Sequence, residues 1–494
     1  MMYKVVIGLE VHCELDTNTK NFSSAPNNFT ETHNINVSTV DLGLPGILPI
    51  ANKEAVKRSL LTSLALNCTL PDEIIFDRKN YFYPDLPKGY QITQNTKPCG
   101  INGYLDILVN GETKRIYIHD LHLEEDTASL EHYPKYSLID YNRSGIPLME
   151  IVTEPCISSA DEAVTFLEDL RDVFLYLGVS EARSNYGQMR CDVNISLMKE
   201  TDTKLGTKVE MKNINAFNNV RAAIEYEIKR QSEILDKGEK VIQETRRIAE
   251  DGKTYSMREK VDALDYKYFI EPNIPSTKVT KEMLDEIKSE LPELKLSRYN
   301  KYINEYGISA YDSEVLSKDR KISDYFERVI KVTSDYNLAV NLVTTAVLST
   351  LNKLELKIED FAIEPETLGE MINLISNKEL SLDHAKKLLY EAISKGVSPL
   401  DLIKEKNLHQ INDKDELLKL ITSLMDKNEE QVRQYVEEDN MSIINFFIGQ
   451  TMKESNRQAN PNMSKEIIKE ELERRKNKWV NIEHIIVVNY QKRI

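Results

Sequence analysis

Cysteine and long hydrophobic runs are scarce in this chain of 494 residues. The five cysteines are an odd number and include no Cys-x-x-Cys pair, which argues against a disulfide framework or a structural zinc site and favours a reducing setting. No stretch approaches the roughly 20 apolar residues of a membrane-spanning helix. The N-terminal apolar segment is interrupted at Glu10, too early for a signal peptide. We therefore expect a soluble, cytoplasmic protein.

Positive charge is also in deficit. The formal net charge is -16 at pH 7, whereas proteins that bind nucleic acid draw their affinity from clustered lysine and arginine. A nucleic-acid partner of this chain would therefore have to meet a local basic patch.

Several familiar catalytic motifs are missing. The segment DGKT at residues 251–254 resembles the end of a phosphate-binding loop, but Arg247 stands where that loop needs a glycine. His12 and Cys13 are adjacent, so on a strand they face opposite ways and cannot pair as base and nucleophile. Neither a Gly-x-Ser-x-Gly elbow nor a Ser-Ser-Lys amidase signature occurs. The chain therefore lacks the means to release ammonia from an amide itself.

Proline and glycine nearly disappear from the C-terminal part of the chain. Thirteen of the 16 prolines lie at or before Pro292, and thirteen of the 17 glycines lie at or before Gly252. Amphipathic helical patterns follow one another beyond that point, with Gly396 and Pro399 marking a joint. We therefore expect a helical part after residue 293 and a smaller helical unit from about residue 408.

The first part mixes strands with helices. Strand-like runs occur at residues 4–15, 115–125, 145–154 and 189–198. The helix predicted over residues 159–177 has a capping pair, Ser159 and Glu162, and a stop at Gly178, and a second helix is predicted to end at Gly238. This mixture predicts an α+β fold with a mixed sheet.

The first strand carries an ionisable face. Alternation along the strand directs Glu10, His12 and Glu14 to the side opposite its apolar residues. Two carboxylates and an imidazole can hold a divalent cation, but they are equally the solvated face of a half-buried strand, and the spacing does not decide between these interpretations. Asp192 and Glu210 also lie on polar strand faces, and we predict that both are exposed.

Two carboxylates lie in apolar surroundings. Glu125 shares a strand face with two leucines, and Glu150 lies within an apolar run. A carboxylate in such a place is paired, protonated or metal-bound. If the two are paired, Arg143 and Arg190 are the candidate partners.

Residues 81–91, YFYPDLPKGYQ, predict a stiff loop. Pro84 and Pro87 fix their own backbone angles, and Gly89 permits a turn that other residues resist. The side chains that this loop presents are Tyr81, Tyr83, Asp85, Lys88 and Tyr90. Such a loop either packs a domain edge or serves recognition, and recognition is favoured because little ordering entropy remains to be lost.

A series of motifs runs along most of the chain. In order, they are GLEVH, DRKNYFYPDLPKGYQITQ, LHLEEDTA, DYNRSGIPLMEIVTEP, MRCDVNISL, GTKVEMKNINAF, QETRR, YFIEPNIP, PELKLSRY, VLSTLNK and FFIGQTMKESNRQANP. This ordered series resembles the B subunit of the tRNA-dependent amidotransferase, the GatB family, over residues 3–475.

The resemblance implies a heterotrimer with an amidase-type A subunit and a small C subunit. The A subunit would hydrolyse glutamine and pass ammonia through a tunnel. The B subunit would use ATP and magnesium to phosphorylate the side-chain carboxylate of glutamyl-tRNA(Gln), and of aspartyl-tRNA(Asn), and ammonia would then displace phosphate. The implied domains are a catalytic cradle at 1–293, a helical domain at 294–407, a YqeY-like tail domain contacting tRNA at 408–476 and an extension of unknown role at 477–494.

The resemblance also implies roles for individual residues. Glu10, Glu125 and Glu210 would be catalytic, and Glu125 and Glu210 would take a proton from incoming ammonium. The implied magnesium ligands are Glu10, His12, Glu125, Glu150 and Glu210. The residues lining the tunnel or substrate pocket would be Lys79, Tyr81, Asp85, Lys88, Tyr90 and Asp192. Lys453, Arg457, Arg474 and Arg475 would bind tRNA, with a solvated helix end as the alternative for each.

The sequence departs from the family in two places. Many members carry a four-cysteine zinc site in the region equivalent to residues 21–46, which here has no cysteine, so we expect no zinc. Residues 479–494 extend past the usual terminus and contain the only tryptophan, Trp479. An added docking strand and a disordered tail are both open for this extension.

Two other interpretations compete with the catalytic B subunit. One is a non-catalytic scaffold that binds tRNA. The other is the related archaeal B-type subunit, which typically carries a large inserted domain for which this chain has no room.

Overall fold

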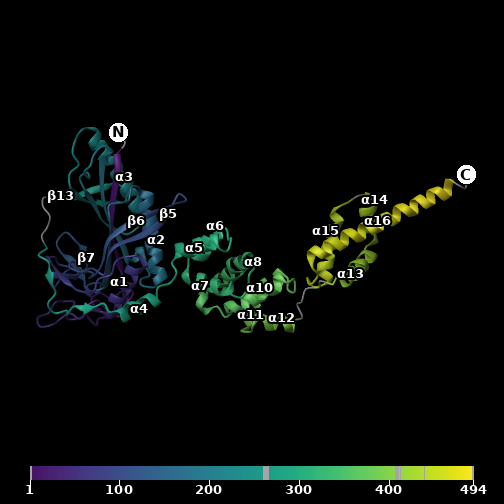
Figure 1. Cartoon of the computed structure of the whole chain (residues 1–494), viewed down its shortest axis with the longest axis horizontal. Helices are drawn as coiled ribbons and strands as arrows, with labels where there is room; N and C mark the ends of the chain where they lie inside the picture. The colour runs from purple at the N-terminus through teal and green to yellow at the C-terminus, as the bar shows by residue number, and fades with distance from the viewer. Residues whose placement is uncertain (1–2, 260–265, 407–410, 412, 439, 492–494) are drawn as a thin grey trace. The chain divides into compact units, whose positions relative to one another are not determined.

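The computed structural model describes residues 3–259, 266–406, 411, 413–438 and 440–491. The chain divides into two compact units, Met1–Lys295 and Leu296–Ile494. All named strands of the described residues belong to the first unit, and the second unit is helical (Figure 1). The prediction of an α+β fold followed by a helical part is confirmed.

The first unit contains fifteen strands and four α-helices among its described residues. The strands are β1 (Tyr3–Glu14), β2 (Glu73–Ile74), β3 (Asp77–Asn80), β4 (Tyr90–Thr93), β5 (Gly100–Val109), β6 (Glu112–Glu125), β7 (Ser129–His132), β8 (Ser137–Asp140), β9 (Pro147–Thr153), β10 (Met189–Lys199), β11 (Val209–Ile214), β12 (Glu244–Ile248), β13 (Thr254–Glu259), β14 (Phe269–Ile270) and β15 (Thr277–Lys278). The helices are α1 (Lys53–Ala65), α2 (Ala160–Leu177), α3 (Phe217–Asp236) and α4 (Lys281–Ser289), with a 3-10 turn, η1 (Ser184–Tyr186).

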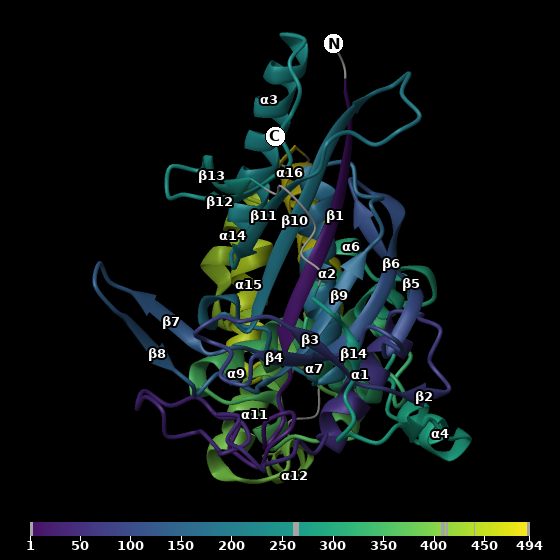
Figure 2. The same cartoon turned by 90° about the vertical axis from the view of Figure 1, so that its left-hand side faces the viewer.

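Eight strands form one mixed sheet in the order β13-β12-β11-β10-β1-β9-β6-β5. Neighbouring strands run antiparallel, except for the parallel pair of β11 and β12. Figure 2 shows β1 in the middle of the sheet, between β10 and β9. The four strand-like runs of the sequence become β1, β6, β9 and β10, so the predicted strands are the sheet's adjacent central members.

One face of this sheet is buried under helices. Ile7, Leu9, Val11 and Cys13 of β1 belong to the main hydrophobic core, and α1, α2 and α3 contact the strands of the sheet. Because side chains alternate along a strand, the ionisable residues of β1 occupy the other face. The predicted division of β1 into an apolar face and a polar face is confirmed.

The ends of α2 follow the predicted capping signals. The hydroxyl of Ser159 accepts a hydrogen bond from the backbone N–H of Glu162 at 3.1 Å. The Glu162 carboxylate accepts from the backbone N–H of Ser158 at 2.6 Å, which is one residue earlier than in the usual capping box. Gly178 ends the helix in the left-handed conformation, with φ 65°.

Three small sheets accompany the large one. They are β14-β3-β4, β15-β2 and the hairpin β7-β8. The strand β4 contacts β6, so the loop between β3 and β4 is held beside the large sheet. This contact brings residues 81–89 close to the sheet's polar residues.

The second unit is built from helices. They are α5 (Lys295–Asn304), which starts at the unit boundary, α6 (Ala310–Ser317), α7 (Arg320–Val329), α8 (Tyr336–Asn341), the π-helical turn η2 (Leu342–Val347), α9 (Leu348–Leu354), the 3-10 turn η3 (Ile358–Asp360), α10 (Pro365–Ser376), α11 (Leu382–Lys395), α12 (Pro399–Glu405), α13 (Lys414–Lys427), α14 (Glu429–Glu438), α15 (Ser442–Glu454) and α16 (Pro461–Gln491). They form two hydrophobic cores, one from Tyr302 to Ile403 and one from Leu417 to Leu472.

The C-terminal extension continues a helix. The backbone of α16 is helical up to Gln491, and Trp479 lies within it. The described part of the extension is therefore neither an added strand nor a disordered tail, and residues 492–494 lie outside the described residues. Within the described part of the chain, no helix combines the length and the apolar character needed to cross a membrane.

Gly103 on β5 offers a test of this packing. A Cβ added there would lie 2.3 Å from Cys68 Sγ and 2.6 Å from the carbonyl oxygen of Leu66. We expect Gly103→Ala to lower the free energy of unfolding by about 1–3 kcal/mol, the usual cost of overpacking. Gly8→Ala on β1 is the matched control, since the nearest atoms would lie 3.8 Å from its Cβ. Urea unfolding followed by circular dichroism measures both, and equal stabilities would contradict the close packing at Gly103.

Candidate active site

The polar face of the large sheet gathers ionisable side chains from adjacent strands. The register pairs His12 of β1 with Glu150 of β9, and Glu150 in turn with His122 of β6. On the other side of β1, Glu10 pairs with Asp192 of β10. Laterally paired residues lie about 5 Å apart. Residues that are remote in sequence therefore meet on one surface.

Cluster one consists of His12, Glu124 and Glu150, whose candidate ligand atoms lie within 4.8 Å of one another. His12 Nδ1 lies 3.6 Å from Glu124 Oε1 and 3.9 Å from Glu150 Oε2. This nitrogen is buried and has no hydrogen-bond partner. His122 borders the cluster, with Nε2 3.1 Å from Glu150 Oε2 and Nδ1 2.7 Å from Asp120 Oδ1.

In cluster one, the imidazoles and the carboxylates stabilise each other's charged forms. Burial lowers the pKa of His12, but the carboxylates of Glu150 and Glu124 outweigh burial and raise that pKa to about 9. Burial likewise opposes the charge on His122, yet Glu150 and Asp120 raise its pKa well above the usual range. Burial raises the pKa of Glu150, but the two imidazoles depress it below its usual range. At neutral pH, protonated imidazoles therefore balance the carboxylates.

Cluster two consists of Glu10, Asp192 and Glu210, and its candidate ligand atoms also lie within 4.8 Å of one another. Lys212 Nζ lies 2.9 Å from Asp192 Oδ2 and 3.4 Å from Glu210 Oε1. Asn194 Nδ2 donates to Glu10 Oε1 at 2.9 Å. The prediction that Asp192 and Glu210 are exposed is wrong, because neighbouring strands leave them only 4% and 6% exposed.

Cluster one fits a divalent cation better than cluster two does. Two ligands bound to one ion at about 2.1 Å lie roughly 3–4 Å apart, which matches the separations of 3.6 and 3.9 Å around His12 Nδ1. An ion bound at cluster one would give the buried Nδ1 of His12 the partner that it lacks. A cation at cluster one would replace the proton of His12, because a ligating imidazole is neutral. In cluster two, the ammonium of Lys212 lies beside Asp192 and Glu210 and would repel an added cation. Because imidazole is an unusual ligand for Mg²⁺, the donor set of cluster one also suits Mn²⁺.

Glu125 lies on the opposite face of β6 from Glu124. Its carboxylate forms an ion pair with Lys88 and accepts the backbone N–H of Ile92 at 2.9 Å. The geometry therefore does not support Glu125 as a ligand beside His12, and Glu124 occupies that place.

The carboxylate that pairs with Arg143 and Arg190 also differs from the predicted ones. Arg190 Nη2 lies 2.8 Å from Asp126 Oδ2, and Arg143 Nε lies 3.5 Å from the same oxygen. The prediction that these arginines pair with Glu125 or Glu150 is wrong. Asp126, which directly follows β6, forms the ion pairs with both guanidinium groups.

The loop at residues 81–91 is preformed, as its prolines and glycine predict. The backbone N–H of Leu86 donates to Tyr83 O, and that of Gly89 donates to Leu86 O, each at 3.0 Å. Gly89 is in the left-handed region, with φ 74°. A second glycine, Gly43 with φ 64°, lies so close that an added Cβ would be 2.8 Å from Lys88 Cγ.

The loop's aromatic side chains have different surroundings. Tyr81 meets Tyr266 edge to face, with centroids 5.9 Å apart, and Tyr90 lies under the guanidinium of Arg78 at 4.0 Å. Phe82 is 93% exposed. Asp85 has a buried oxygen, Oδ1, without a hydrogen-bond partner. The roles of Tyr81, Asp85 and Tyr90 in a tunnel or substrate pocket stay predictions.

Lys79 of β3 lies on the same side as cluster one, since it lines a cavity together with His122 and Glu150. Burial lowers the pKa of its ammonium, but Glu124, Tyr268 and Glu150 together raise that pKa above its usual value. Its Nζ lies 5.0 Å from the ring centroid of Tyr266. Lys79 therefore stays charged although it is half-buried.

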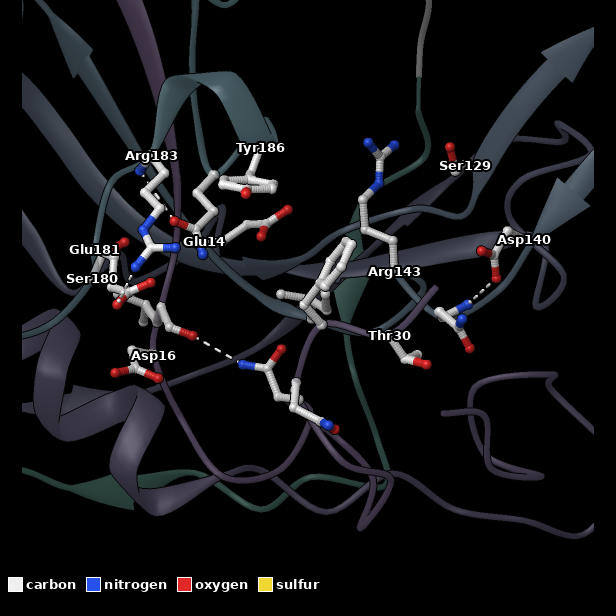
Figure 3. Close-up of a pocket in the computed structure, with 17 residues that line it drawn as sticks. Glu14, Asp16, Thr30, Ser129, Asp140, Arg143, Ser180, Glu181, Arg183 and Tyr186 are labelled. Atoms are coloured by element: carbon white, nitrogen blue, oxygen red, sulfur yellow. Dashed lines mark hydrogen bonds and ion pairs between the residues drawn. The ribbon is translucent and has the colours of Figure 1, made fainter. Parts of the chain in front are cut away.

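Three cavities border the ionisable side chains of the large sheet. The first, of about 420 Å³ and called the β1 cavity, lies between the end of β1, residues 27–30 and η1. Figure 3 shows Glu14, Arg183 and Tyr186 on one side of it and Arg143 and Asp140 on the other.

The second cavity, called the β6 cavity, has a volume of about 410 Å³. Its lining includes Glu150 of cluster one, His122, Lys79 and Tyr268. The third cavity, of about 200 Å³, borders Glu10 of cluster two. The two clusters are thus reachable by small molecules.

Sequence reasoning missed Glu124, His122 and Lys212. The first two share a face because they are two residues apart in HDLHLEED. That spacing was the available signal, but the apolar neighbours of Glu125 favoured the other face. Lys212 likewise lies two residues from its partner Glu210 on β11, whereas its second partner, Asp192, comes from the pairing of β10 with β11.

The residues predicted to bind tRNA differ in their surroundings. Arg474 and Arg475 both pair with Glu471, at 2.7 and 3.0 Å. Lys453 and Arg457 are exposed at the end of α15 and in the segment that follows it. Their contact with tRNA stays a prediction.

Comparison with known proteins covers nearly the whole chain. Residues 5–285 match the GatB/GatE catalytic domain, and residues 324–472 match the GatB domain. The chain is 44% identical to the B subunit of the aspartyl/glutamyl-tRNA(Asn/Gln) amidotransferase of Persephonella marina, over 95% of this chain and 99% of the relative. Proteins of the same name from Macrococcus caseolyticus and Staphylococcus saprophyticus are 43% and 44% identical, each over 96% of this chain and 100% of the relative.

The ion pair of Lys88 and Glu125 offers a test of the loop's attachment. Both side chains are largely buried, so we expect Lys88→Met to lower the free energy of unfolding by about 3–5 kcal/mol, because it leaves a buried charge unpaired. The double variant Lys88→Met with Glu125→Gln removes that charge and should recover most of the loss. Calorimetric melting of both variants measures the effect. A double variant no more stable than the single one would show that the pair is not what holds the loop.

Proposed function

The chain belongs to the GatB family, and on that basis we propose that it performs the ATP-dependent amidation step of the aspartyl/glutamyl-tRNA(Asn/Gln) amidotransferase. It is the B subunit of this glutamine-hydrolysing enzyme. In the proposed complex, which works in the cytoplasm, an amidase-type A subunit supplies ammonia and a small C subunit completes a heterotrimer. The substrates are glutamyl-tRNA(Gln) and aspartyl-tRNA(Asn).

The reaction runs in two steps. A side-chain carboxylate oxygen of the misacylated residue attacks the γ-phosphorus of ATP, and ADP leaves with the electrons of the broken P–O bond. Ammonia then attacks the acyl carbon, and phosphate leaves with the electrons of the C–O bond while one nitrogen-bound proton passes to a base. The first step is needed because a free carboxylate is a poor acyl donor, whereas an acyl phosphate has a good leaving group.

The observation that carries this proposal is the convergence of cluster one, cluster two and Lys79 on one face of the sheet. His12, Glu124 and Glu150 are the residues that would hold a divalent cation, which when bound would neutralise developing phosphoryl charge. Lys79 adds a fixed positive charge beside that place. Positioned charges of this kind are the main contribution of a protein to phosphoryl transfer.

Glu10 is the best placed proton acceptor of the three proposed catalytic carboxylates. Burial, followed by the charge of Glu150, raises its pKa, and a base is more effective as its pKa approaches the working pH. Glu125 and Glu210 each lie beside a lysine, Lys88 and Lys212. Their carboxylate oxygens are thus already held by ammonium groups, which leaves Glu10 as the better placed acceptor.

In this proposal, exposed basic residues bind the tRNA. Lys453 and Arg457 lie in the region that matches the GatB domain. They are better candidates than Arg474 and Arg475, since the latter two pair with Glu471 at 2.7 and 3.0 Å, whereas Asp383 approaches Arg457 only to 3.8 Å. A local patch of this kind reconciles a net charge of -16 with a nucleic-acid substrate.

Glu124→Gln tests the catalytic role. In the complex of the three subunits, we expect this variant to lose Mn²⁺ binding and to lower the rate of amidation by at least about 100-fold, because a ligand of the ion is lost. Hydrolysis of glutamine by the A subunit should continue. Electron paramagnetic resonance measures bound Mn²⁺, and conversion of glutamyl-tRNA(Gln) measures amidation.

Two further variants act as controls. The double variant Lys88→Met with Glu125→Gln should keep Mn²⁺ binding, because the Glu125 carboxylate faces away from cluster one and removing both partners leaves no buried charge unpaired. Glu112→Gln, at the exposed start of β6, should leave both measurements unchanged. A Glu124→Gln complex that amidates at the unaltered rate would instead favour the scaffold that only binds tRNA.

A further inference from the structure

Thr245 of β12 brings a hydroxyl group to the carboxylates of cluster two. Its Oγ1 donates a hydrogen bond to Glu210 Oε2 at 2.9 Å, and the residue is only 2% exposed. The other oxygen of the same carboxylate, Oε1, lies 3.4 Å from Lys212 Nζ. A hydroxyl and an ammonium therefore approach the two oxygens of Glu210 separately, and together they define how this carboxylate is turned.

The position of Thr245 depends on a short stretch of parallel pairing. The register of β11 and β12 joins Glu210 to Thr245 and Met211 to Arg246. On the other side of β12, the pairing with β13 shifts its register between Thr245 and Arg246. Irregularities of this kind are common next to active sites, where they aim a particular side chain.

A buried ionic network on the opposite face of β12 holds this strand in place. Arg246 forms ion pairs with Glu227 of α3 at 3.1 Å and with Glu244 at 2.6 Å. Its guanidinium also donates to the backbone carbonyl oxygen of Thr254 on β13 at 2.7 Å. Glu227 is fully buried, so breaking this network would be costly. Because side chains alternate along a strand, the residue before Arg246 faces cluster two.

We propose that Thr245 is a positioning residue for the amidation reaction, whose hydroxyl fixes the orientation of the Glu210 carboxylate within cluster two. This inference rests on the proposed function and adds a residue to its site. Thr245 acts through Glu210 and contacts no reacting group itself. The candidate ligand atoms of Glu10, the proposed proton acceptor, and of Glu210 lie within 4.8 Å of each other. A turn of Glu210 therefore changes the surroundings of the acceptor.

Removal of the hydroxyl changes the balance of forces on Glu210. A hydrogen bond to a charged oxygen is stronger than one between neutral groups. Its loss favours a turn of the carboxylate toward Lys212, whose Nζ also lies 2.9 Å from Asp192 Oδ2. An ammonium that moves toward one carboxylate weakens its contact with the other. The effect of one hydroxyl therefore extends through cluster two.

Thr245→Val tests this role, because valine is also β-branched but has no hydroxyl. In the complex of the three subunits, we expect kcat for amidation to fall about tenfold, the effect of losing one hydrogen bond to a charged group. KM for glutamyl-tRNA(Gln) and for ATP should stay within about twofold, since Thr245 contacts neither substrate. Thr245→Ser keeps the hydroxyl and should restore kcat to within about threefold of the original. Steady-state kinetics gives all of these constants.

Thr350→Val is the matched control for the loss of a buried hydroxyl. Thr350 lies in α9 of the second unit, is 6% exposed and donates to the carbonyl oxygen of Ala346 at 2.7 Å. Its replacement makes the same chemical change away from cluster two, so it should leave kcat unchanged. Melting curves of the three variants show whether each remains folded.

The outcomes separate this inference from the proposed function. If the unaltered complex amidates and a folded Thr245→Val complex keeps its kcat, the inference is wrong and the function stands. A loss of kcat that Thr245→Ser does not restore, or that Thr350→Val shares, would assign the effect to packing and also overturn the inference. An unaltered complex that makes no glutaminyl-tRNA with ATP would overturn the proposed function, and the inference with it.

Discussion

The pairing of β1 with β9 and β10 is the constraint on which the site depends. Three antiparallel strands place His12 beside Glu150 and Glu10 beside Asp192. A shift of this register by one residue would turn every ionisable side chain of β1 into the apolar core and every apolar one into the site. The hydrophobic contacts of Ile7, Leu9 and Val11 with the helices beneath the sheet therefore fix the chemistry above it.

The second requirement is that buried charges are compensated where they lie. Carboxylates in a protein interior are costly unless they are paired or bind a cation. The structure meets that requirement with imidazoles at cluster one, with Lys212 at cluster two and with Lys88 at Glu125. Only the nitrogen of His12 keeps an unmet hydrogen-bonding capacity within cluster one. At cluster two, the buried atom without a partner is instead Asn194 Oδ1, on the amide that donates to Glu10.

Much of the fold could be predicted from local pattern. Alternation identified the two faces of β1, capping residues placed α2, and the loss of proline and glycine marked the helical part. Each of these signals acts over a few residues, so one sequence is enough to show it. The resemblance in ordered motifs supplied the family, which local pattern could not.

The details of the site were less predictable because they depend on strand order. Glu124 and Glu125 are equally acidic, and only the position of β6 beside β9 shows which of them faces His12. Asp192 was expected at the surface because the sequence does not show that β11 covers it. Arg143 and Arg190 were assigned to the wrong carboxylates for the same reason, since Asp126 reaches them only after β6 ends.

The contact between Gly43 and Lys88 has an evolutionary consequence. The backbone at residue 43 lies against the side chain that neutralises Glu125, with no room for even a methyl group. A substitution at residue 43 would thus disturb the ion pair of Lys88 and Glu125, which lie in two other segments of the chain, and selection would act against it. A lineage could accept a bulkier residue there only by rebuilding the loop around Lys88 as well.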